Sequence, residues 1–180
     1  MDPDARLEEW IKVSVATARF DPFMLPIIQS LGKIDTDLIK ADAEYLANFE
    51  TLNNSIDESI KLGERITTSY LWVLGSYEVI RTMSQRISDG VVSASNDLTE
   101  HFRSVKNDFN RLRVPLAKFE SSQRHKSTDS HIAFPGIHLD HGISWQVSED
   151  THIARRELSD KFLVLLAHSR SEKIKSSNET

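Results

Sequence analysis

The chain has 180 residues, a formal net charge of -5 and a hydrophobic fraction of 39%, a composition typical of one soluble globular domain. It contains no cysteine, which excludes disulfides, thiolate zinc sites and a cysteine nucleophile. Because the sequence lacks an apolar run of about 18 residues and an N-terminal signal peptide, we expect a cytoplasmic protein without a membrane-spanning helix.

The first third of the chain predicts three helical segments. Apolar side chains at helical spacing indicate a helix over residues 4–19. Asp21-Pro22 then begins a short apolar turn or helix over residues 22–32. Pro26 should disturb this segment and Gly32 should end it. A further helix is expected over residues 36–54, with Asp35 or Asp37 as its N-cap.

The middle of the chain predicts two long helices that pack as an antiparallel central pair. Apolar residues in residues 57–88 recur at alternating spacings of four and three, and Asp89-Gly90 ends this helix. The positions of this stripe are Ile66, Tyr70, Val73, Tyr77 and Ile80. The same spacing continues in residues 97–120, where Asn96 or Asp97 is the expected N-cap and Pro115 should kink or restart the helix.

The last third changes character. Residues 121–150 are polar or alternating, which predicts a loop with a small extended flap or hairpin inside residues 131–147. A final helix is expected over residues 151–168, followed by a disordered tail at residues 169–180. The predicted fold is therefore one all-α domain over residues 1–168, a bundle of four to six helices with a long antiparallel central pair.

Two clusters of residues can carry chemistry. Seven lysines and arginines stand against two acids between residues 101 and 126, so this segment either attracts phosphate or docks on the acidic first third. The histidine-rich loop offers His138, Asp140 and His141 as metal-ligand candidates, although their spacing matches no established metal motif. A glycine-rich phosphate loop is absent from the sequence, and we expect no cofactor.

A nine-residue segment, LRVPLAKFE at residues 112–120, resembles the signature of HEPN domains. That family's motif has an arginine, often followed by asparagine, and a histidine several residues later. Arg113 matches the arginine, but Val114 replaces the asparagine and Lys118 replaces the histidine. The resemblance implies a dimeric bundle of four or five helices, in which the active members of the family cleave RNA.

These observations give three hypotheses about function. The leading one is a non-catalytic helical module that binds a partner protein or a phosphate-bearing ligand, at a groove of Glu78, Arg111, Arg113 and Lys118. The alternative is a HEPN-type ribonuclease or toxin-like RNA-binding protein, and the third is a metal-dependent enzyme that uses the histidine loop. Since the helix at residues 57–88 carries apolar residues on more than one face, we also expect a homodimer.

Overall fold

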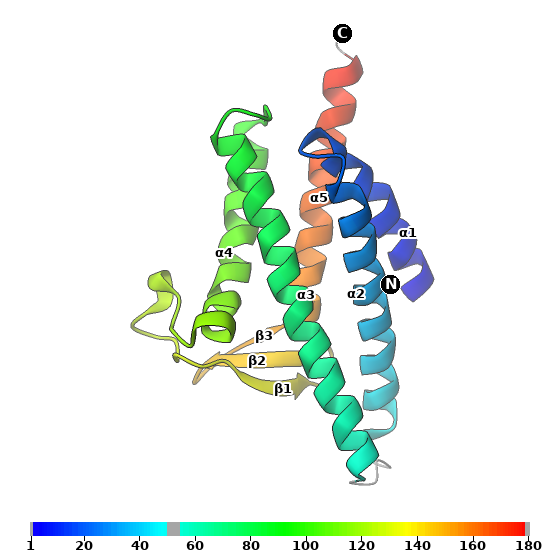
Figure 1. Ribbon diagram of the computed structural model, residues 1–180, viewed down its shortest axis with the longest axis vertical. Helices are drawn as coiled ribbons and strands as arrows, with labels where there is room; N and C mark the ends of the chain where they lie inside the picture. The colour runs from blue at the N-terminus through cyan, green and yellow to red at the C-terminus, as the bar shows by residue number, and fades with distance from the viewer. Residues whose placement is uncertain (1, 50–54, 179–180) are drawn as a thin grey trace.

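The computed structural model describes residues 2–49 and 55–178, with side chains described as far as Glu172. The chain is mostly helical and carries one small three-stranded antiparallel sheet (Figure 1). Its helical segments are α1 (Pro3–Ser14), η1 (Val15–Arg19), α2 (Met24–Ala47), α3 (Ile56–Ser88), α4 (Asn96–Lys118), η3 (Gln123–His125) and α5 (Arg155–Asn178). The strands are β1 (Phe134–His138), β2 (Gly142–Ser148) and β3 (Thr151–Ala154).

The prediction of two separate segments in the region of α2 is wrong, because α2 runs without a break from Met24 to Ala47. Pro26 is only the third residue of the helix, where its missing N–H leaves no intrahelical hydrogen bond unmade. Gly32 lies inside the helix, and a Cβ built there would stand 2.5 Å from Cγ of Trp10. Gly32 therefore permits α1 to pack closely on α2, and it does not end the helix. Residues 50–54 of the predicted segment lie outside the described residues.

The two long helices α3 and α4 begin and end near the predicted residues. Ser55 caps α3 by accepting a hydrogen bond from the N–H of Glu58, and Gly90 follows the helix with a φ of 71°. Ser95, one residue before the predicted N-cap, caps α4. The predicted restart at Pro115 is wrong, because α4 continues as one helix to Lys118.

The predicted hairpin is confirmed, but the sheet is larger than expected. β1 pairs with β2, and β2 pairs with β3, which occupies the first four residues of the predicted last helix. That helix, α5, begins at Arg155 and extends to Asn178, so residues 169–178 are helical where a disordered tail was predicted. One reason is a tertiary contact, since Glu172 accepts a hydrogen bond from the N–H of Ser95 over 2.8 Å.

Most apolar side chains in the C-terminal half of α3 are covered within one chain, although Leu71 in the middle of the helix is 59% exposed. Trp72 and Met83 belong to a second apolar face of this helix, outside the stripe from Ile66 to Ile80, and they are 1% and 0% exposed. The Trp72 ring packs against Phe109 of α4, which in turn makes an edge contact with Phe162 of α5. The homodimer stays a prediction, and the buried face of Trp72 and Met83 no longer provides a reason for it.

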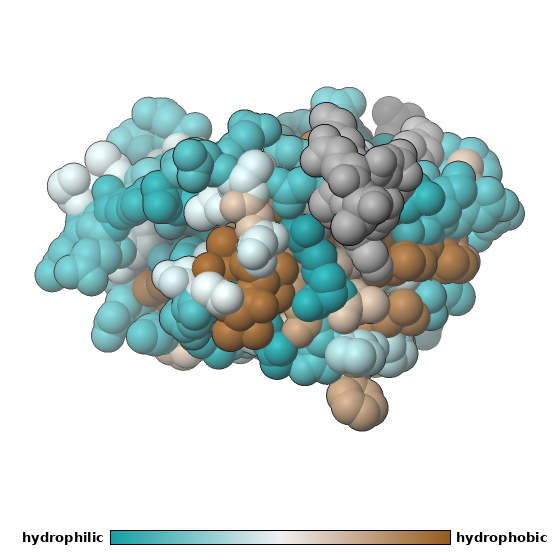
Figure 2. All heavy atoms as spheres, turned by 90° about the horizontal axis from the view of Figure 1, so that it is seen from above, coloured by the Kyte–Doolittle hydropathy of each residue, from teal (hydrophilic) through white to brown (hydrophobic). Residues whose placement is uncertain are grey.

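Hydrophobic side chains also gather on the outside of the molecule. The end view shows brown areas between hydrophilic surface, at the end where the α3–α4 turn lies (Figure 2). The exposed apolar residues of α2 and the turn before it include Phe23, Ile27 and Ile34. Within the described part of the chain, every helix is too short or too polar to cross a membrane.

Candidate functional site: a basic groove at the end of α4

A groove of about 740 Å³ lies where α4 ends and the chain turns toward the sheet. Arg113 and Lys118 reach it from α4, and Lys126 and His131 reach it from the loop between α4 and β1. With Glu120 as the acidic residue of its lining, the groove has a formal charge of +2 when His131 is neutral (three bases minus one acid). This excess of positive charge is suited to an anionic ligand.

Contacts from α3 hold Arg113 in place. Its guanidinium carbon lies 5.0 Å from the centre of the Tyr77 ring, and Nη2 lies 3.7 Å from Oε1 of Glu78. Glu78 also pairs with Arg81 at 2.7 Å, and both of these side chains are about half exposed. Arg113 is thus oriented by an aromatic face and a loose ion pair, which leaves its N–H donors available to a ligand.

The other cations of the groove are unpaired. Among the described residues, Lys118 and Lys126 make neither a hydrogen bond nor an ion pair, and the same holds for the His131 ring. Most other described lysines have acidic partners, as Lys33 does with Asp37 at 2.5 Å, while Lys106 donates to the hydroxyl of Ser84. The groove is therefore a place where positive charge is left uncompensated.

Arg111 does not join this groove. Its guanidinium donates to both carboxylate oxygens of Asp129, over 2.8 and 2.9 Å, a bidentate pair. The hydrogen bond to Asp129 raises the pKa of Arg111 above its ordinary value. Arg111 thus fastens the loop to α4, and of the four residues selected from the sequence only Arg113 and Lys118 line the groove, with Glu78 behind Arg113.

The histidine loop is arranged as a turn. The rings of His138 and His141 stack with their centres 4.8 Å apart, and the N–H of Asp140 donates to Nδ1 of His138. In the described residues, no group of three or more histidine, aspartate or glutamate side chains is placed to hold a metal ion. The loop geometry therefore does not support the metal-dependent hypothesis.

No protein-family model, curated protein or solved structure matches this chain.

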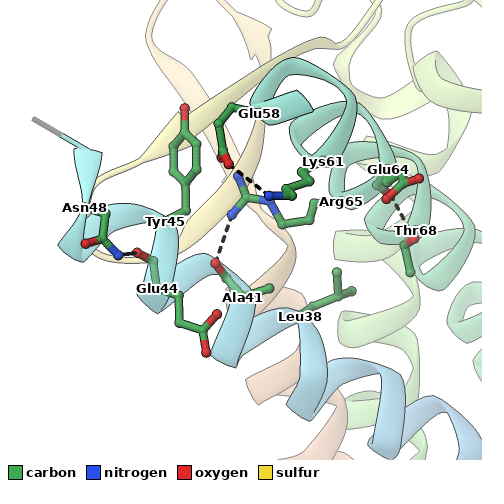
Figure 3. A pocket seen from close by; sticks show the side chains of 10 residues that line it. All are labelled: Leu38, Ala41, Glu44, Tyr45, Asn48, Glu58, Lys61, Glu64, Arg65 and Thr68. Atoms are coloured by element: carbon green, nitrogen blue, oxygen red, sulfur yellow. Dashed lines mark hydrogen bonds and ion pairs between the residues drawn. The ribbon is translucent and has the colours of Figure 1, made fainter. Parts of the chain in front are cut away.

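A second cavity, of about 620 Å³, lies between the end of α2 and the start of α3 (Figure 3). Its two bases are engaged: Lys61 pairs with Asp57 and Glu58, while Arg65 donates to the carbonyl of Ala41. The Arg65 guanidinium also lies 4.1 Å from the centre of the Tyr45 ring. With three glutamates in its lining (Glu44, Glu58 and Glu64), this cavity offers no free cation to an anionic ligand.

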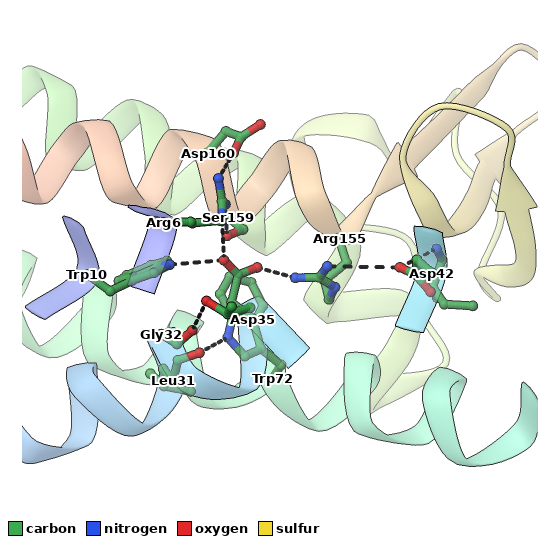
Figure 4. A network of polar contacts seen from close by, with 12 residues as sticks. Arg6, Trp10, Leu31, Gly32, Asp35, Asp42, Trp72, Arg155, Ser159 and Asp160 are labelled. Carbon is green, nitrogen blue, oxygen red and sulfur yellow. Dashed lines mark hydrogen bonds and ion pairs between the residues drawn. The ribbon is translucent and has the colours of Figure 1, made fainter. Parts of the chain in front are cut away.

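A buried ionic network, which no pattern in the sequence indicates, is centred on Asp35 (Figure 4). Asp35 is fully buried on α2 and accepts hydrogen bonds from Nε of Arg6, from the indole N–H of Trp10 and from Nη1 of Arg155. Ser159 of α5 accepts from Nη2 of the same Arg6. The network therefore joins α1, α2 and α5.

The electrostatics of the network favour an ionised Asp35. Burial alone would raise its pKa, but Arg155 and Arg6 together outweigh burial and hold the pKa of Asp35 below its usual value. Burial dominates at Asp42, whose pKa is raised, and one of its carboxylate oxygens has no hydrogen-bond partner. The network lies in the core away from the groove, and we interpret it as structural.

Proposed function

We propose that this chain is a non-catalytic helical-bundle protein, with α3 and α4 as its central pair, that binds a phosphate-bearing ligand in the groove at the end of α4. The observation that carries the proposal is the convergence of Arg113, Lys118 and Lys126 on one groove. Among the described residues, the two lysines have no acidic partner. A phosphate group would supply the missing negative charge.

The arginine and the two lysines of the groove would contact a phosphate in different ways. Arg113, held by Tyr77 and Glu78, presents a planar guanidinium that suits bidentate contact with phosphate oxygens. The two lysines of the lining add flexible point charges. Because Arg113 is oriented before the ligand arrives, less conformational entropy is lost on binding.

The test is calorimetric titration of the full chain with inorganic polyphosphate, which carries phosphate charge and no other recognition feature. If three phosphates are neutralised, log K should fall with log[salt] with a slope of about -2, taking about 0.7 per phosphate of a single strand. Arg113→Gln and Lys118→Gln should each weaken binding and reduce that slope. Lys33→Gln, which removes an equal charge from α2, should leave both unchanged.

Two results would contradict the proposal. One is the absence of binding at low ionic strength. The other is an equal loss of affinity in Lys33→Gln and Lys118→Gln, which would show that the ligand responds to the net charge of the molecule and not to this groove.

A ribonuclease is the second candidate function, and the position of His131 favours it. His131 precedes β1, yet it lines the same groove as Arg113. It would supply an imidazole as the acid–base group of the reaction, in place of the histidine that Lys118 replaces in the motif. Cleavage of a labelled RNA, lost in His131→Ala while polyphosphate binding remains, would support this function. An intact RNA after prolonged incubation would contradict it.

A further inference from the structure

The residue that ends α4 has an unusual backbone conformation. Phe119 has φ 56° and ψ 40°, and within the described residues it is the one residue other than glycine with a positive φ. This left-handed conformation at a helix C-terminus normally belongs to glycine or asparagine, because a bulky side chain is strained there. The chain therefore keeps a large aromatic residue where a smaller one would fit the backbone better.

The phenyl ring gains little from burial in return. Phe119 is 67% exposed, whereas Phe102 and Phe109 of the same helix are 1% and 0% exposed. Its side chain lines the basic groove beside Lys118. A strained residue whose side chain is exposed in a candidate site points to a role in binding.

We propose that Phe119 is a stacking platform for a nucleobase, so that the ligand of the groove is a nucleotide unit, either a free nucleotide or part of a single strand. This inference rests on the proposed function and specifies its ligand. Arg113, Lys118 and Lys126 would contact phosphate oxygens, while the face of the phenyl ring would contact the base. A positively charged groove and exposed aromatic side chains are the features with which proteins bind single-stranded nucleic acids.

The test compares three probes on the full chain. A fluorescein-labelled decamer of adenylate RNA reports binding by fluorescence anisotropy, while adenosine monophosphate and inorganic polyphosphate serve as competitors. If adenosine monophosphate displaces the labelled RNA at a concentration close to the concentration of RNA nucleotides that binds, the ligand is a free nucleotide. Much weaker displacement would identify a single strand, which contacts more than one cation.

The decisive variant is Phe119→Leu, which keeps an apolar side chain at the same backbone position but has no aromatic face. We expect it to bind the RNA at least about fivefold more weakly, since stacking on one aromatic residue accounts for about 5- to 150-fold in affinity. Phe119→Tyr should bind as the wild type does. Phe134→Leu, at an exposed position on β1 outside the groove lining, should have no effect.

The outcomes separate this inference from the proposed function. If RNA binds with the expected salt dependence but Phe119→Leu and wild type have equal affinity, the base platform is refuted while the phosphate groove remains. If neither RNA nor polyphosphate binds, both are refuted. Phe119→Gly tests whether a loss of binding comes from misfolding, because glycine suits the left-handed backbone at this position. This variant should unfold at the same temperature as the wild type or at a higher one. It should lose affinity for RNA and keep its affinity for polyphosphate.

Discussion

Replacement of Asp35 by asparagine is expected to destabilise the protein more than any other change of a single charge. The substitution keeps the size of the side chain but removes its negative charge. Arg155, which is 0% exposed, would then keep only a distant ion pair with Asp42 at 4.0 Å. Arg6 would keep Asp160, which it contacts at 2.6 Å. One buried guanidinium is thus left without adequate compensation.

The magnitude follows from the cost of an unpaired buried charge. Breaking a buried ion pair by removing one partner costs about 3–5 kcal/mol in free energy of unfolding. Since domains of this size are stable by only about 5–15 kcal/mol, Asp35→Asn should lose a large part of that stability at pH 7. In the wild type, the contribution of Asp35 is complete above its ordinary pKa of 3.8. It is lost as the pH falls through the lower pKa of the folded state.

Urea denaturation at pH 7, followed by circular dichroism, measures the loss. Asp42→Asn is the matched control on the same helix, because the raised pKa of Asp42 means that its ionised form opposes folding at neutral pH. We expect a smaller loss for Asp42→Asn than for Asp35→Asn. A loss below about 1 kcal/mol for Asp35→Asn, the value of an exposed ion pair, would refute the reasoning.

Two further predictions concern other packed contacts. Gly32→Ala should lower the free energy of unfolding by about 1–3 kcal/mol, because its Cβ would overlap Trp10. Gly63→Ala, in a helical position with open space around it, should raise that free energy by up to about 1 kcal/mol; equal effects in the same denaturation assay would contradict this. Burial, and then repulsion from His168 with its Nδ1 3.1 Å away, lowers the pKa of His101. The free energy of unfolding should therefore fall as the pH drops below 6.5. His101→Gln should make that free energy depend less on pH, and an unchanged pH dependence would contradict the prediction.

The sequence predicted those parts of the fold that depend on local periodicity. The stripe of α4 placed Phe102 and Phe109 on the inner face, and both are buried. The error at α2 came from reading Gly32 as a helix end. Its neighbour Trp10 lies on another helix, and a contact between segments distant in sequence leaves no periodic signal.

The candidate site was predictable only where it is built on neighbouring helices. Because α3 was expected to pack beside α4, Arg113 was expected to lie near Glu78, and the two side chains do form an ion pair. Lys126 and His131 reach the groove through an irregular loop, whose path no local pattern specifies. The assignment of Arg111 to the groove was wrong for the same reason, because its partner, Asp129, belongs to that loop.

The ionic network also affects the order in which the chain folds. Arg6 and Asp35 are 29 residues apart, whereas Asp35 and Arg155 are separated by 120 residues. Contacts of such long sequence separation require the ends of a long loop to meet, so they form late and slow the search for the native state. During synthesis, Asp35 emerges from the ribosome well before Arg155. The first two helices can pair Arg6 with Asp35 between themselves, but the network is complete only when α5 brings Arg155 to Asp35.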